Sequence, residues 1–181
     1  MIRKIVEYFI ELWYSIFRLN VNDGVIIMKG NKLTVFDVAN YFRSKESMSH
    51  KKLQKLVYYS YAWYIALNND SKDDINNKLF DDCFFEAWVH GPVCRPLYNL
   101  YSDNYGFVNK HHGKVNNLIC GELKKFLDSV YKTFGKYTGD ELETISHLET
   151  PWKNARGSLT PSEPSGKALL ESDMFVYYNN L

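Results

Sequence analysis

The run FEAWVHGPV at residues 85–93 constrains the fold more than any other part of the sequence. Gly91 can adopt backbone angles that other residues avoid, while Pro92 fixes its own φ and supplies no N–H. The residue before a proline avoids the α region, so we expect Gly91 to be extended or in a turn. The run therefore ends any helix or strand ladder at this point.

Helical patterning dominates the rest of the chain. Apolar residues recur at helical spacing in 34–44, 49–67, 118–134, 138–149 and 167–178, and a short helix is expected at 95–102. Thr34 with Asp37 and Thr138 with Glu141 form capping-box patterns, and Ser49 can cap the longest helix. We predict the mainly α class: a single compact multi-helix domain, with a short β-hairpin or extended segment around 84–93 and 105–115.

Charge and cysteine content narrow the function classes. Lys+Arg 22 against Asp+Glu 21 gives a net charge of +1, so no global field draws the chain to nucleic acid or to an anionic membrane. Cys83, Cys94 and Cys120 lack CxxC spacing, which argues against a disulfide framework or a zinc site. We interpret them as buried, reduced thiols of a cytoplasmic protein, and we expect no cofactor.

Residues 1–32 are interpreted as an amphipathic extension that precedes the domain at 33–181. Apolar residues form a helical stripe between Ile2 and Leu19, but charges interrupt it, so we expect no stable insertion into a membrane. A small-residue cleavage site does not follow the stripe, which argues against a secretory signal. The codons of Gly24-Val25 can form a nucleotide sequence that resembles a ribosome-binding site. We therefore hypothesise that translation starts at Met28.

Three segments resemble the Panacea domain, the family of SocA-like antitoxins also described as GepA-type phage-associated proteins. They read KLQKLVYY at 52–59 with AWY at 62–64, EAWVHGPV at 86–93 with LFD before it and LY after it, and HLETPWKNAR at 147–156. Their order and approximate spacing are also similar, from about Leu33 to the C-terminus. The residues that carry the resemblance are Lys52, Leu53, Gln54, Tyr58, Trp63, Glu86, Trp88, Gly91, Pro92, His147, Glu149, Pro151, Trp152 and Arg156.

The resemblance implies a mainly helical antitoxin. Such a protein neutralises a cognate toxin, encoded by the adjacent gene, through direct protein contact. SocA-like members also resemble adaptors that deliver their toxin to a protease, so a protease is a second implied partner. The resemblance implies no enzymatic activity.

The segment around Trp88 is the first candidate site. If it is extended, alternation places Glu86, Trp88 and His90 on one face, and an acid beside a histidine can transfer protons. A nucleophile or an oxyanion loop does not accompany them, so we predict no catalytic residues. Either Glu86 and His90 satisfy buried polar groups while Trp88 packs, or Trp88, His90 and Arg95 contact a partner. In the first case, Trp88→Ala costs about 3–5 kcal/mol.

Two other groups of polar residues are weaker candidates. Glu149 can pair with Lys153 or Arg156 near the start of a short helix, which is a framework role. The adjacent His111 and His112 lack nearby cysteine or acidic ligands at metal spacing, so we predict no metal site there.

A basic cluster around the turn before the longest helix supports an alternative function. A helix-turn-helix protein places such charges on its second helix to read DNA, which would make this chain a regulator of its own operon or of a prophage. The helix carries aromatic residues nearly all round, however, and so resembles a core helix with a solvated basic end. The cluster consists of Lys45, His50, Lys51, Lys52 and Lys55.

Overall fold

The structure is a computed structural model that describes residues 32–103 and 106–181. The predicted amphipathic extension, apart from its last residue, and the Met28 start lie outside the described residues. The helices are α2 (Val35–Arg43), α3 (His50–Asn68), α4 (Arg95–Tyr101), α5 (Gly121–Phe134), α6 (Gly139–Leu148), α7 (Thr150–Arg156) and α8 (Glu171–Asn179). The strands are β1 (Met48–Ser49), β2 (Glu86–Trp88), β3 (Gly91–Val93) and β4 (Phe107–Val108).

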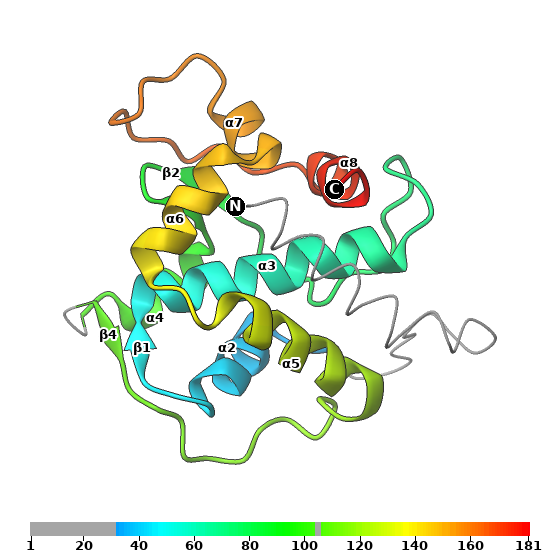
Figure 1. The fold of residues 1–181 in the computed structure, drawn as a ribbon, viewed down its shortest axis with the longest axis vertical. Helices are drawn as coiled ribbons and strands as arrows, with labels where there is room; N and C mark the ends of the chain where they lie inside the picture. The colour runs from blue at the N-terminus through cyan, green and yellow to red at the C-terminus, as the bar shows by residue number, and fades with distance from the viewer. Residues whose placement is uncertain (1–31, 104–105) are drawn as a thin grey trace.

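Helix α3 passes through the middle of the molecule, with α2 and α5 on one side and α6, α7 and α8 on the other (Figure 1). Its residues are buried nearly all round, and Tyr59 stacks on Phe134 with 4.1 Å between ring centroids. The prediction of a mainly α domain is confirmed, and α3 is its core helix. Among the described helices, none is long and apolar enough to cross a membrane.

The predicted helix starts are confirmed where a side chain caps them. Thr34 accepts a hydrogen bond from Asp37 N, and the Asp37 carboxylate accepts one from Thr34 N. Thr138 and Glu141 make the same reciprocal pair at the start of α6. At α3, Ser49 Oγ accepts a hydrogen bond from Lys52 N at 3.1 Å. These caps satisfy backbone N–H groups that the first helical turn leaves free.

Two small antiparallel sheets complete the fold. Strands β2 and β3 form the hairpin expected around 84–93, with Ala87 opposite Pro92 and Trp88 opposite Gly91. For the region around 105–115, we predicted either a hairpin or an extended segment, and the extended segment is observed. Strand β4 pairs with β1, which is distant in the chain, rather than with a neighbouring strand.

Gly91 is required at the start of β3. Its φ is +88°, and a Cβ atom there would lie 2.7 Å from Lys55 Cε and 2.8 Å from Ser146 Oγ. Gly91→Ala is therefore expected to lower the free energy of unfolding by about 3 kcal/mol, measured by urea denaturation. Gly121 is the matched control, because its φ is +51° but open space surrounds its Cβ position. Equal losses for Gly91→Ala and Gly121→Ala would show that the close approach of Lys55 does not matter.

The interpretation of three buried, reduced thiols is wrong. Cys83 and Cys94 form a disulfide with 6.2 Å between their Cα atoms, and Cys120 is free and exposed. The two paired cysteines lie 11 residues apart, a separation that matches no spacing motif. The hairpin brings them together because it folds the chain back between them, and the disulfide then links its two ends.

Candidate partner-binding groove

The start of α3 holds one side of the β2–β3 hairpin. The Gln54 side-chain amide binds the Cys94 backbone twice: Cys94 N donates to Gln54 Oε1 at 2.9 Å, and Gln54 Nε2 donates to Cys94 O at 3.2 Å. The next residue, Lys55, donates from its Nζ to Pro92 O at 3.0 Å. The segment KLQK thus contributes two side chains that fix the backbone at the end of the hairpin.

Helix α7 holds the other side of the hairpin. Trp152 Nε1 donates to Trp88 O at 3.0 Å, and Arg156 Nη1 donates to Ala87 O at 3.1 Å. Both carbonyls belong to β2, so the segments at 52–64 and 147–156 meet at the hairpin between them. The three segments that carry the family resemblance form one structural unit.

The chain after α7 adds to this unit. Ala87 N donates to Lys167 O at 2.8 Å, and Leu169 N donates to Phe85 O at 2.8 Å. Residues 167–169 therefore run extended beside β2, which explains why α8 begins at Glu171 rather than at the predicted residue 167.

Most of the resemblance residues serve this framework. Leu53, Tyr58 and Trp63 are buried on α3, and Pro151 is buried on α7. His147 stacks on Trp152 with 4.0 Å between ring centroids. These positions fix the fold around the hairpin.

The predicted pairing of Glu149 with Lys153 or Arg156 is wrong. Glu149 is 3% exposed and accepts hydrogen bonds from Tyr178 at 2.7 Å and Tyr59 at 3.2 Å. Burial raises the pKa of Glu149 to about 8, although the hydrogen bonds from Tyr178 and Tyr59 oppose the shift. Glu149 therefore joins α8 to α3 in the core.

Glu86, Trp88 and His90 do not act as one group. Strand β2 ends at Trp88, and His90 lies in the turn, where its Nδ1 is 3.0 Å from Glu143 Oε1 on α6. Glu86 instead accepts hydrogen bonds from Trp88 Nε1 at 2.8 Å and from Arg95 Nε at 2.9 Å. Burial raises the pKa of the Glu86 carboxyl, but the bonds from Arg95 and Trp88 outweigh it and hold that pKa below its usual range.

Trp88 is half-buried rather than a core residue, so the cost of 3–5 kcal/mol for Trp88→Ala does not apply. The Arg95 guanidinium lies 5.3 Å from its ring centroid, and the centroid of the Tyr98 ring lies 4.8 Å from that of Trp88. Tyr98 in turn stacks on His50 at 5.3 Å. We call these four side chains, from Arg95 through Trp88 and Tyr98 to His50, the aromatic ladder.

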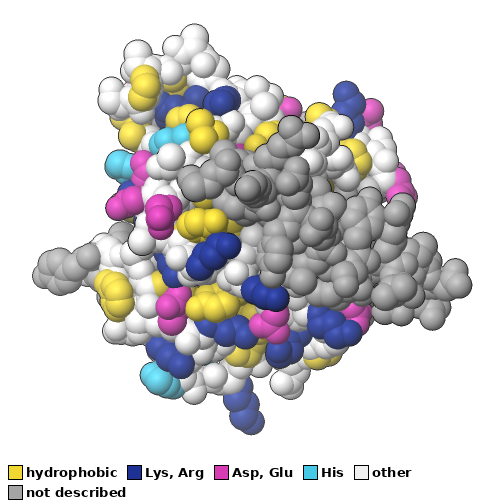
Figure 2. All heavy atoms as spheres, in the orientation of Figure 1, with side chains coloured by type: hydrophobic (Ala, Val, Ile, Leu, Met, Phe, Trp, Pro, Cys, Tyr) yellow, Lys and Arg dark blue, Asp and Glu magenta, His cyan; other side chains and the backbone are white. Residues whose placement is uncertain are grey.

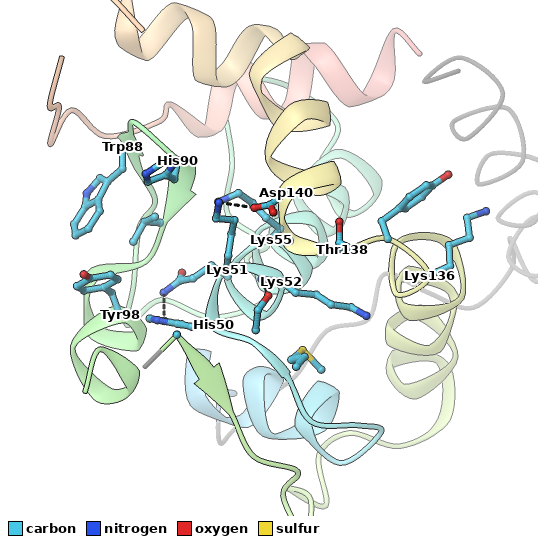
Figure 3. A pocket seen from close by; sticks show the side chains of 17 residues that line it. His50, Lys51, Lys52, Lys55, Trp88, His90, Tyr98, Lys136, Thr138 and Asp140 are labelled. Atoms are coloured by element: carbon cyan, nitrogen blue, oxygen red, sulfur yellow. Dashed lines mark hydrogen bonds and ion pairs between the residues drawn. The ribbon is translucent and has the colours of Figure 1, made fainter. Parts of the chain in front are cut away.

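Trp88, Tyr98 and His50 of the aromatic ladder line one side of a groove with a volume of about 770 Å³. The first turns of α3 form its floor, and the loop from α5 to α6 forms the opposite wall. In Figure 3, Trp88 and Tyr98 lie on one side of the groove and Lys136 and Thr138 on the other. A second hollow of about 400 Å³ lies where Trp88 and Arg95 face residues 164–166.

Basic side chains line the floor and the far wall of the groove. Lys51 Nζ lies 2.7 Å from Asp140 Oδ1, and Lys136 is exposed beside Tyr137. Lys55 is 1% exposed, and burial lowers its pKa to about 7 even though the charge of Glu143 raises it. The groove therefore combines an aromatic wall with a floor of paired or buried lysines and an exposed lysine, Lys136, on the far wall.

The basic cluster does not have the free charges that a DNA-reading helix needs. Lys45 pairs with Asp128 at 2.7 Å and Lys52 with Glu46 at 2.7 Å. Figure 2 shows basic and acidic side chains intermixed on the visible face. Across residues 32–103 and 106–181, no three His, Cys, Asp or Glu side chains gather as a metal site.

Sequence reasoning placed Trp88, His90 and Arg95 near a binding surface but missed Tyr98 and His50 as parts of it. The signal was present, since Leu97-Tyr98 follows the hairpin within the second resemblance segment. What it lacked was the position of α4 against the start of α3, which brings the Tyr98 and His50 rings together.

These features define a helical domain built around a clamped hairpin, with a groove suited to binding. A family model for the antitoxin SocA-like Panacea domain matches residues 53–153. The chain therefore belongs to the SocA-like antitoxin family of Panacea domains. Comparisons with curated proteins and with solved structures found no match.

Proposed function

We propose that this protein neutralises a toxin encoded by the adjacent gene by binding it directly, and that it acts without catalysis. The observation that carries the proposal is the groove, whose aromatic ladder presents the residue types that dominate protein interfaces. Membership of the antitoxin family supplies the class of partner. We place this activity in the cytoplasm, where both proteins are synthesised.

The test expresses the adjacent gene in a bacterial host with and without this protein. We expect growth arrest when the adjacent gene is expressed alone, restored growth when both are expressed, and co-elution of the two proteins. A partner gene that is harmless alone, or that stays toxic in the presence of this protein, would contradict the proposal. The half-life of the toxin distinguishes two modes of neutralisation. Binding that only blocks the toxin leaves this half-life unchanged, whereas delivery to a protease shortens it.

DNA-binding regulation of its own operon or of a prophage is the alternative. Phosphate contacts need lysines that are free to release counterions, and Lys45, Lys51 and Lys52 are engaged in ion pairs. We therefore expect no shift of the upstream DNA in a gel-shift assay at low salt. A specific shift that weakens steeply with added salt would instead establish the regulator.

A further inference from the structure

The aromatic ladder has the composition of an interface hot spot. Hot spots are enriched in Trp, Tyr and Arg, whose truncation accounts for most of the affinity lost in alanine scans. Here Trp88, Tyr98 and His50 line the groove, with Tyr98 stacked on His50 and tilted against Trp88. The Arg95 guanidinium lies over the Trp88 ring, and Tyr98 is 37% exposed. Glu86 accepts hydrogen bonds from Arg95 and Trp88 and so holds both side chains in place. These two side chains therefore lose little conformational entropy when a partner binds.

Apolar surface continues beyond the ladder. Phe107 on β4 is 52% exposed. Phe107 is the pairing partner of Ser49, which lines the groove floor. Exposed apolar residues that adjoin a groove are a common mark of protein–protein contact.

The other side of the groove favours negative charge. The starts of α3 and α6 lie close together, because a Cβ on Gly139 would be 2.9 Å from Ser49 Oγ and 3.0 Å from Lys52 N. Helix N-termini carry partial positive charge. Lys51 pairs with Asp140 and Lys52 with Glu46, whereas Lys136 is exposed on the far wall of the groove. The positive charge that a partner meets on this side is therefore that of Lys136 together with the two helix starts.

We propose that the groove holds a short segment of the toxin in which an apolar side chain packs on Trp88 and Tyr98 and a carboxylate lies beside Lys136 and the starts of α3 and α6. This inference rests on the proposed function and names its contact surface. A volume of about 770 Å³ accommodates a few side chains rather than a whole domain face. The pairing of an apolar wall with a cationic wall favours such a mixed segment over DNA, which would need no aromatic wall of this kind.

The test measures the affinity of the purified adjacent-gene product for the wild-type protein and for groove variants by titration calorimetry. Trp88→Ala and Tyr98→Ala are each expected to weaken binding at least tenfold. Lys136→Glu is expected to weaken it about fivefold and to reduce its dependence on salt. Far-ultraviolet circular dichroism checks that each variant is folded, and the exposed position of Lys136 keeps one variant free of any packing effect.

Matched controls lie outside the groove. Phe84 is an aromatic side chain 59% exposed on the loop before β2, and Lys114 is an exposed lysine in the loop before α5. Phe84→Ala and Lys114→Glu are expected to bind within twofold of the wild type. If all three groove variants bind the toxin as tightly as the wild type, the groove is not the contact surface, but the proposed function still stands. A wild-type protein that does not bind the toxin would overturn both, and self-association that the groove variants abolish would show a second copy as the occupant.

Discussion

Replacing Arg156 with alanine is expected to lower the free energy of unfolding by about 4 kcal/mol. Arg156 is 3% exposed, and its guanidinium donates to Ala87 O at 3.1 Å, Thr160 O at 2.6 Å and Glu163 O at 2.7 Å. It also lies 5.0 Å from the Trp152 ring centroid. Alanine leaves these carbonyls without their donor and removes the packing, and a buried group that loses its partner costs about 1–3 kcal/mol.

Two controls make the Arg156 result specific. Arg156→Lys keeps the charge but not the planar fork, so we expect it to recover less than half of the lost stability. Lys153 is exposed on the same helix, and Lys153→Ala is expected to stay within about 0.5 kcal/mol of the wild type. Urea denaturation measures all three variants. A loss under about 1 kcal/mol for Arg156→Ala would show that Arg156 does not fix the hairpin.

Glu149→Gln is expected to remove a pH dependence of stability that the wild type shows between about pH 4.5 and pH 8. Burial raises the pKa of Glu149 from 4.5 to about 8, so the folded state keeps a proton that the unfolded state releases. The sign follows from linkage: the contribution of Glu149 is fully present below pH 4.5 and is lost as the pH rises to 8. The full loss is on the order of 4–5 kcal/mol, because each pKa unit corresponds to about 1.4 kcal/mol.

Lys55 acts in the opposite direction over a different range. Burial lowers its pKa from 10.5 to about 7, so the unfolded state holds the extra proton and stability rises between pH 7 and pH 10.5. The difference between wild type and Glu149→Gln isolates the carboxyl, since Lys55 contributes equally to both. A difference that does not change between pH 5 and pH 8 would contradict the raised pKa of Glu149.

Local signals in the sequence predicted the helical frame correctly. The capping pairs Thr34–Asp37 and Thr138–Glu141 and the cap at Ser49 act within one helical turn, so their residue types are enough to locate a helix start. The His-Gly-Pro run marked the hairpin turn, and Gly91 takes a positive φ there. The expectation that the run ends the strand ladder is wrong, because Gly91 and Pro92 begin β3 and pair with Trp88 and Ala87 of β2.

Contacts between distant parts of the chain could not be predicted in the same way. Glu149 binds Tyr59, which is 90 residues away, and Cys83 reaches Cys94 through the fold of the hairpin. Trp88 and Trp152 look alike in the sequence, but one is half-exposed on the groove and the other is buried beneath the hairpin. Exposure decides which tryptophan can meet a partner, and it follows from packing rather than from residue type.

Amide hydrogen exchange of this protein, alone and in complex with the adjacent-gene product, tests most directly the claim that it binds a toxin through the groove. The account predicts added protection at the first turns of α3, at residues 88–98 and in the loop from α5 to α6, because these segments form the groove. Protection confined to other surfaces would contradict the groove, and an exchange pattern unchanged by the toxin would contradict direct binding.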